Sequence, residues 1–268
     1  MKTLYLYDSD KGWVLFEYDV LSDLAHEFSI RNIRIGDGCK LGYDCELGDG
    51  CWLGDDCKLG DDCKLGDGCK LGYGCKLGYG CELGYGCELG NGCELGNYCK
   101  LGDDCKLGNY CKLGNYCKLG DDCKLSNYCK LGNGCELGNY CKLGNGCELC
   151  YGCELGDDCK LGNYCKLGDD CKLGNGCELG NGCELGYGCE LGNYCKVEHT
   201  LCIHASRHTI TYWGCDAIQI GCNQYMISEW LSHYENIGRS ENYSDKEIEE
   251  YWMYIDMIKH IHESGALM

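Results

Sequence analysis

Cysteine recurs at every sixth position from Cys39 to Cys195, 27 times without a skipped step. Of the residues in this sequence, it is the one whose side chain could take part in the widest range of chemistry. Thiolates are soft ligands that suit Cu(I) or Zn, so columns of thiols could form a metal store. Neighbouring thiols could also pair as disulfides where their Cα atoms come within about 4.4–6.8 Å. A third role is packing, because free cysteine is small and is among the most often buried residues. The element that carries the thiols decides between these roles.

The repeated unit reads Cys, then Lys or Glu, then Leu, Gly and two variable residues. In an extended strand, alternate side chains point to opposite faces, so Cys and Leu share one face and the charged residue takes the other. The remaining positions are rich in Gly, Asn and Asp, which tolerate the dihedral angles of turns. Each hexad therefore predicts a short strand followed by a corner. Ser126 and Cys150 replace the corner glycine, so that position does not strictly demand glycine.

The period of six residues excludes an α-helix, because it would place successive leucines on opposed faces and repeat a glycine that costs about 1 kcal/mol each time. The pattern resembles the hexapeptide repeat of left-handed parallel β-helices, in which three hexads make one triangular coil. We therefore expect an all-β solenoid, a left-handed parallel β-helix of about nine triangular coils. The domains are then an N-terminal hairpin-helix cap (1–35), the β-helix (36–197) and a C-terminal α+β module with terminal helices (198–268).

For the inward cysteines this architecture favours packing over metal binding. A thiol must lose its proton to bind a metal, which is costly in a dry interior, and the inward set contains no histidine or carboxylate. We expect no metal site and no cofactor, and a thiol-rich Cu(I) or Zn protein is the alternative. In-register cysteines one coil apart lie near the separation that a disulfide needs. Cys150, between Cys147 and Cys153, falls at a corner and is expected to be the most accessible thiol of the repeats.

The outward positions predict charged faces and tyrosine-bearing corners. Residues 18 apart would stack, so opposite charges one coil apart could pair weakly. Stacking should also place Tyr98 on Tyr116 and Tyr110 on Tyr128, as a protein or carbohydrate contact surface or as plain ladder packing. One face would carry Glu46, Lys64, Glu82, Lys100, Lys118, Glu136, Glu154, Lys172 and Glu190.

The net charge of −19 is spread over the whole chain, and none of the three regions is basic. This argues against direct binding of a nucleic-acid backbone, although an acidic surface could mimic a polyanion. No run of 18 apolar residues exists, so we expect no membrane span. The N-terminal residues lack the apolar stretch of a signal peptide. We expect a cytoplasmic protein with reduced thiols, in the host cytoplasm if the protein is viral.

The two ends differ in composition from the repeats. Residues 1–35 predict a hairpin, followed by a short helix over residues 23–28 with Ser22 as its N-cap. In the C-terminal module, residues 209–213 and 217–221 look like strands, and residues 227–238 predict a helix closed by Gly238. Ser244 and Glu247 form a capping box for a last helix. Its apolar stripe is expected to consist of Ile248, Trp252, Ile255 and Ile258.

Residues 205–230 resemble the C-terminal module of small hexapeptide-repeat proteins that are frequent in tailed-phage and prophage genomes. The resemblance implies a viral origin and assigns no activity. The matching positions are Ser206, Arg207, Thr211, Gly221, Cys222 and Trp230.

For function, the best-known hexapeptide β-helix proteins are transferases, generally trimers, whose acyltransferases rely on a histidine base on a coil. This sequence has no histidine between His26 and His199. We therefore expect a non-catalytic binding or scaffold protein, a homotrimer, in which Arg207, His208 and Cys222 bind an anionic small ligand. As a counter-defence protein it would sequester that ligand or engage a host protein. The alternatives are a thiol-rich metal-binding protein, a hexapeptide acyltransferase and a structural virion component.

Overall fold

The computed structural model describes residues 2–8, 12–18, 34–187, 189–192, 195–197, 201–212 and 216–263. The chain divides into two compact units, Met1–Gly138 and Asn139–Met268. The predicted helix over residues 23–28, with Ser22 as its N-cap, lies outside the described residues.

The first unit contains an antiparallel hairpin and a series of two-residue strands. Strands β1 (Lys2–Asp8) and β2 (Gly12–Tyr18) pair so that Asp8 lies opposite Gly12, as the sequence predicts. In each later strand, the leucine, or Ile35 in β3, points inward and the charged residue, or Trp52 in β6, points outward. The strands are β3 (Arg34–Ile35), β4 (Lys40–Leu41), β5 (Glu46–Leu47), β6 (Trp52–Leu53), β7 (Lys58–Leu59), β8 (Lys64–Leu65), β9 (Lys70–Leu71), β10 (Lys76–Leu77), β11 (Glu82–Leu83), β12 (Glu88–Leu89), β13 (Glu94–Leu95), β14 (Lys100–Leu101), β15 (Lys106–Leu107), β16 (Lys112–Leu113), β17 (Lys118–Leu119), β18 (Lys124–Leu125), β19 (Lys130–Leu131) and β20 (Glu136–Leu137).

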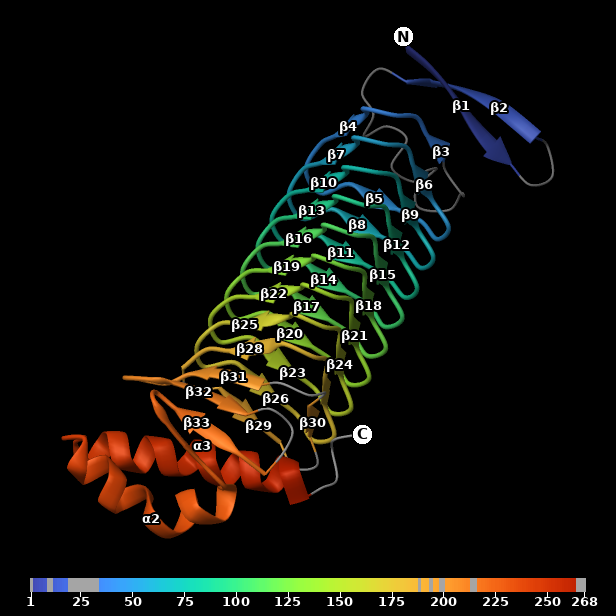
Figure 1. Cartoon of the computed structure of the whole chain (residues 1–268). Helices are drawn as coiled ribbons and strands as arrows, with labels where there is room; N and C mark the ends of the chain where they lie inside the picture. Colours follow the sequence, from blue (N-terminus) through green and yellow to red (C-terminus); the bar gives the residue numbers. More distant parts are fainter. Residues whose placement is uncertain are drawn as a thin grey trace. The chain divides into compact units, whose positions relative to one another are not determined.

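Strands three apart in the chain pair in parallel and in register, so that Glu82 lies beside Lys100 and Leu83 beside Leu101. Within the first unit this pairing builds three sheets, ordered β3-β6-β9-β12-β15-β18, β4-β7-β10-β13-β16-β19 and β5-β8-β11-β14-β17-β20. Successive strands belong to different sheets, so one coil takes three hexads (Figure 1). The parallel β-helix that the hexad spacing predicts is confirmed.

The second unit continues the same pattern and ends in a different module. Strand β31 pairs in parallel with β28, and β32, β33 and β34 then add to it in antiparallel order. Over both units the hexads make about nine turns of a parallel β-solenoid. The elements are β21 (Lys142–Leu143), β22 (Glu148–Leu149), β23 (Glu154–Leu155), β24 (Lys160–Leu161), β25 (Lys166–Leu167), β26 (Lys172–Leu173), β27 (Glu178–Leu179), β28 (Cys183–Leu185), β29 (Glu190–Leu191), β30 (Lys196–Val197), β31 (Leu201–His204), β32 (Thr209–Tyr212), β33 (Ile218–Ile220), β34 (Asn223–Tyr225), α2 (Ile227–Ser240) and α3 (Asp245–Glu263).

The interior of the described coils is made of cysteine and leucine. From Leu47 to Leu185 these leucines are at most 5% exposed, and the hexad cysteines from Cys51 to Cys183 are at most 1% exposed. The hexad thiols from Cys57 to Cys135 each donate a hydrogen bond to the carbonyl oxygen 21 residues earlier, as Cys105 Sγ does to Gly84 O (3.3 Å). The hexad thiols are therefore packed in the interior of the coils and are not exposed to solvent.

The two helices of the C-terminal module correct two details of the sequence analysis. Helix α2 continues past Gly238 to Ser240. Position 238 favours glycine because α3 packs there, and a Cβ would be 2.8 Å from Cγ1 of Ile248. The predicted stripe on α3 is correct for Ile248, Ile255 and Ile258, but Trp252 lies at its edge and is 40% exposed. The Ser244–Glu247 capping box is confirmed. Neither helix combines the length and apolarity that crossing a membrane requires.

Candidate functional site

The outward charges form columns in which Lys and Glu one coil apart pair. Glu88 accepts hydrogen bonds from Lys106 and Lys70, each with an N–O distance of 3.0 Å. The Lys106 ammonium, followed by that of Lys70, lowers the pKa of the Glu88 carboxyl. Glu94 is held in the same way between Lys76 (2.6 Å) and Lys112 (3.3 Å). These pairs are exposed, so each contributes only about 0.2–1 kcal/mol.

Tyrosine rings stack on one another at two of the three corners of the coils in the first unit. At one corner Tyr79, Tyr98 and Tyr116 follow one another, with ring centroids 5.2 and 5.1 Å apart. At another corner Tyr110 stacks on Tyr128 at 5.3 Å with an angle of 10° between the rings. Both predicted stacks are confirmed. The five rings remain 46% to 60% exposed, so they form continuous aromatic edges on the surface. We call these two sets the tyrosine edges.

Four of the five tyrosines, all except Tyr79, have a backbone in the left-handed region. Tyr98 has φ 61°, Tyr116 58° and Tyr128 60°. The conformation belongs to the corner itself, because Gly134 adopts it too, with φ 62°, one coil after Tyr116. For a residue with a side chain it costs about 1–2 kcal/mol.

The predicted ligand residues Arg207 and His208 lie side by side in the second unit, on the side chains of α3 and of the α2–α3 turn. The Tyr251 hydroxyl accepts hydrogen bonds from the backbone N–H groups of His208 (2.6 Å) and Arg207 (3.3 Å), and donates to the His208 carbonyl oxygen (3.1 Å). The Arg207 guanidinium lies 4.7 Å from the ring centroid of Tyr243, and its Nη1 donates to Asn242 O (3.1 Å). Arg207 is thus already engaged within the chain.

The third predicted ligand residue, Cys222, is exposed and follows Gly221 in the turn between β33 and β34. The His208 ring packs over Gly221, where a Cβ would lie 3.2 Å from Cγ of His208. The structure therefore brings the three residues into one region of the module. Sequence reasoning missed the two tyrosines that organise it. Tyr251 is detectable in hindsight, since it lies three residues after Ile248 on the buried stripe of α3.

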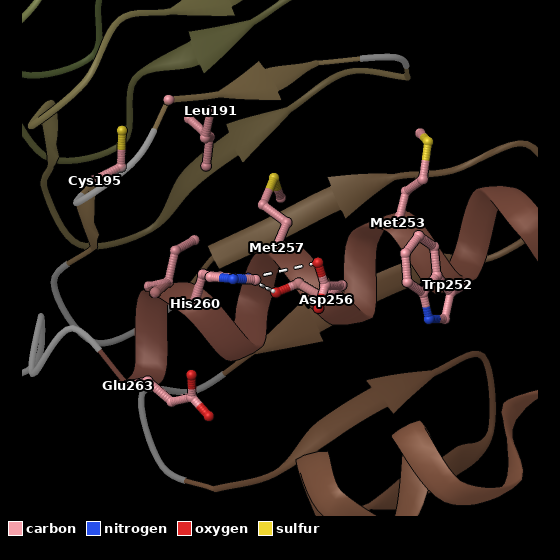
Figure 2. A pocket seen from close by; sticks show the side chains of 10 residues that line it. Leu191, Cys195, Trp252, Met253, Asp256, Met257, His260 and Glu263 are labelled. Carbon is pink, nitrogen blue, oxygen red and sulfur yellow. Dashed lines mark hydrogen bonds and ion pairs between the residues drawn. The ribbon is translucent and has the colours of Figure 1, made fainter.

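A groove of about 790 Å³ lies between the last coil and α3. Figure 2 shows Leu191 and Cys195 on the side of the coil and Met253, Met257 and His260 on the side of the helix. His260 Nδ1 is 3.5 Å from the Asp256 carboxylate and 2.8 Å from the Asp256 carbonyl oxygen. A groove of this size fits a small molecule. It was not predicted, because Cys195 and α3 are far apart in sequence.

The pKa values of the buried thiols shift in both directions. The Cys93 thiol lowers the pKa of the Cys75 thiol to about 7. Burial raises the pKa of the Cys57 thiol. The neighbouring Cys105 thiol, together with burial, raises the pKa of the Cys87 thiol to about 12. In the described part of the chain, no group of three or more His, Cys, Asp or Glu side chains is arranged to hold a metal ion. Cys150 is exposed, as predicted.

Comparison with known proteins identifies the repeats. A sequence model of the family described as bacterial transferase hexapeptide (six repeats) matches residues 44–79, 86–119, 116–150 and 152–187, just over half of the chain. No curated protein and no solved structure matches the chain.

Proposed function

The chain belongs to the bacterial transferase hexapeptide family, and we propose that it is a non-catalytic scaffold that binds a protein partner through its tyrosine edges. The observation that carries this proposal is the positive φ of Tyr98, Tyr116 and Tyr128 at an exposed corner. Tyrosine is enriched among the residues that dominate protein interfaces.

An energetic comparison supports a role in display. A side chain in the left-handed region costs about 1–2 kcal/mol, while a stacked aromatic pair contributes about 0.5–1.5 kcal/mol. The two terms are similar, so stacking does little more than offset the backbone cost. Glycine fills the same corner position at Gly134 and Gly80, which shows that the coil forms without tyrosine there. The tyrosines are therefore better explained by what they contact than by coil stability.

Catalysis is not favoured, because the acyltransferases of this fold use a coil histidine and the hexads contain none. Near α3, Cys195 is a poor nucleophile, because its thiol is 2% exposed and donates to Gly174 O at 3.3 Å. The test is to incubate the protein with acetyl-CoA and a panel of amine and hydroxyl acceptors. We expect no thioester cleavage above the background rate, and turnover would overturn this part of the proposal.

The binding test compares the wild type with the double variant Tyr98→Gly, Tyr116→Gly. Both proteins are cross-linked in extract of the native host, and captured proteins are quantified by mass spectrometry. We expect a partner that the double variant loses by at least tenfold. The control, Lys100→Ala, removes an outward charge between the two tyrosines in sequence and should keep the partner. Equal capture by all three proteins would exclude the tyrosine edges as the binding surface.

A narrower version of the proposal gives the chain a phage or prophage origin and a host protein as the partner, in the host cytoplasm. The resemblance of residues 205–230 to a phage-associated module supports it. An alternative proposal, in which Arg207, His208 and Cys222 bind an anionic ligand, is less favoured, because Arg207 Nη1 already donates a hydrogen bond to Asn242 O. Incubation with a panel of nucleotides tests it, and depletion of any nucleotide would reinstate it.

We also propose that the scaffold is a homotrimer, since hexapeptide-repeat proteins often form trimers. Light scattering coupled to size-exclusion chromatography tests this directly. A mass three times that of the 29.8 kDa chain is the expected result, and a monomer would overturn it.

A further inference from the structure

The parallel register of the first unit places cysteines in columns. Hexad cysteines 18 residues apart precede directly paired strands, such as β4 and β7, and therefore lie about 4.8 Å apart along the coil axis. This spacing is inside the Cα range of about 4.4–6.8 Å that a disulfide needs. The first thiol column comprises Cys39, Cys57, Cys75, Cys93, Cys111 and Cys129, and the second comprises Cys45, Cys63, Cys81, Cys99, Cys117 and Cys135.

The thiols within a column are oriented by the backbone. Cys81 Sγ donates to Gly60 O at 3.2 Å, and Cys75 Sγ donates to Gly54 O at 3.1 Å. Cys57 Sγ also donates to Gly36 O at 3.2 Å, and Cys63 Sγ donates to Gly42 O at 3.2 Å. The thiols of a column are thus held at the same position of successive coils, with another thiol of the column one coil away.

Each of the two columns has one accessible end. Cys39 and Cys45 are half-buried, whereas Cys57 and Cys63, one coil further, are 1% and 0% exposed. An oxidant in solution therefore meets the columns first at Cys39 and Cys45. The third column of this unit begins at Cys51, which is fully buried.

We propose that the first and second thiol columns are a reversible oxidation site, which peroxide enters at Cys39 and Cys45 and which stores the oxidation as disulfides between thiols one coil apart. The peroxide oxidises the Cys39 thiol to a sulfenic acid and is itself reduced to water. The Cys57 sulfur then attacks the Cys39 sulfur, the S–O bond breaks and a second water leaves with the thiol proton. The result is a Cys39–Cys57 disulfide, and Cys45–Cys63 forms in the same way.

The column also permits the disulfide to move. The Cys75 sulfur approaches Cys57 from the side opposite Cys39, which is the direction that thiol–disulfide exchange requires. Attack forms the Cys57–Cys75 bond, breaks the Cys39–Cys57 bond and transfers the Cys75 proton to the leaving Cys39 sulfur. No electrons are gained or lost in this step. Oxidation at the end of a column can therefore pass inward, while Cys39 returns to the thiol state and can react again.

The first experiment maps disulfides in the full-length protein. Reduced protein receives hydrogen peroxide, remaining thiols are alkylated, and non-reduced tryptic peptides are sequenced by mass spectrometry. We expect Cys39–Cys57 and Cys45–Cys63 to appear first, followed by Cys57–Cys75 and Cys63–Cys81 after catalase has removed the peroxide. Links between cysteines six apart, or irreversible oxidation without disulfides, would overturn the proposal. A pattern that stays fixed after catalase would overturn the inward movement.

Two matched variants test the entry point. In Cys39→Ser we expect disulfides of the first column to form at least tenfold more slowly, while Cys45–Cys63 forms at the wild-type rate. Cys45→Ser should give the reverse result. The unchanged column in each molecule reports that the coils remain folded. Equal rates in both columns of either variant would show that oxidation does not enter at Cys39 and Cys45.

Discussion

The ring of Tyr116 lies over Gly134, the residue at the same corner one coil further along, and a Cβ added to Gly134 would meet Cδ1 and Cε1 of Tyr116 at 2.7 Å. The last ring of this tyrosine edge thus packs directly on the backbone of the next coil, at a residue without a side chain. Gly86 has nearly the same backbone, φ 64° against 62° for Gly134, but nothing lies within 4 Å of a Cβ placed there. Comparing substitutions at Gly86 and Gly134 therefore separates two contributions to the free energy of unfolding: the positive φ and the contact with the Tyr116 ring.

We expect Gly86→Ala to lower the free energy of unfolding by about 1–2 kcal/mol, the cost of a positive φ for alanine. Gly134→Ala should cost more, because the Tyr116 ring must also move. Urea unfolding of both full-length variants measures the difference. A loss for Gly134→Ala equal to or smaller than that for Gly86→Ala would show that the ring does not rest on this corner.

A second prediction concerns the interior thiols. Cys105→Ala removes a fully buried sulfur and its hydrogen bond to Gly84 O, and should lower the free energy of unfolding by about 1–2 kcal/mol. Cys150→Ala is the control, since Cys150 is exposed and its removal should change stability by less than about 0.5 kcal/mol. Thermal unfolding under reducing conditions compares the two. If Cys105→Ala is neutral, cysteine is not needed as an inward packing residue at that coil.

A third prediction concerns Tyr251, whose hydroxyl joins α3 to the Arg207–His208 segment. Tyr251→Phe leaves the His208 N–H and carbonyl oxygen without that partner, so we expect a loss of about 1–3 kcal/mol. Hydrogen exchange of the Arg207 and His208 amides should accelerate with it. Tyr234→Phe loses only a 3.4 Å contact with Glu235 and should leave both measurements unchanged. Unchanged exchange in Tyr251→Phe would contradict the role of the hydroxyl.

A fourth prediction concerns pH. The Glu88 pKa is lowered by Lys106 and then Lys70, so the ionised carboxylate stabilises the fold at neutral pH, and this contribution disappears as the pH falls through the lowered pKa. Because the pairs are exposed, Glu88→Gln should cost less than about 1 kcal/mol at pH 7 and nothing at pH 2. Glu136→Gln should lower the free energy of unfolding at pH 7 by less than Glu88→Gln does, because within the first unit Glu136 pairs with Lys118 (2.9 Å), whereas Glu88 pairs with two lysines. Urea midpoints across this pH range provide the check, and a cost at pH 2 equal to that at pH 7 would contradict it.

Much of the solenoid is predictable from the sequence, because one rule repeats in every hexad. The alternation of Cys, charge and Leu fixes the inward face, and stacking at 18 residues follows from the three hexads per coil that the resemblance to hexapeptide-repeat proteins implies. The Tyr98–Tyr116 and Tyr110–Tyr128 pairs follow from the same arithmetic. The corner angles are less obvious, because tyrosine at a positive φ runs against its usual preference.

The C-terminal module is less predictable, because it has no repeat and its contacts join distant residues. Its strands and the Ser244 capping box follow local rules, but Gly238 and Trp252 do not. Glycine usually marks a helix end, whereas Gly238 lies within α2, where a Cβ would be 2.8 Å from Cγ1 of Ile248. Trp252 fits the apolar spacing of α3, yet it lines the groove instead of the core. The engagement of Arg207 by Asn242 and Tyr243 requires the fold of the turn between the two helices.

The three-strand coil also bears on how such a gene can change length. A tandem duplication or deletion of 18 residues adds or removes one full turn and leaves every later residue on the face or corner that it occupied before, since residues 18 apart, such as Glu82 and Lys100, stack. A change of six residues keeps cysteine inside but moves every later tyrosine to the adjacent edge. Unequal recombination among these near-identical units can therefore lengthen or shorten the solenoid. The arrangement of the outward side chains is preserved only when the change is a whole number of turns.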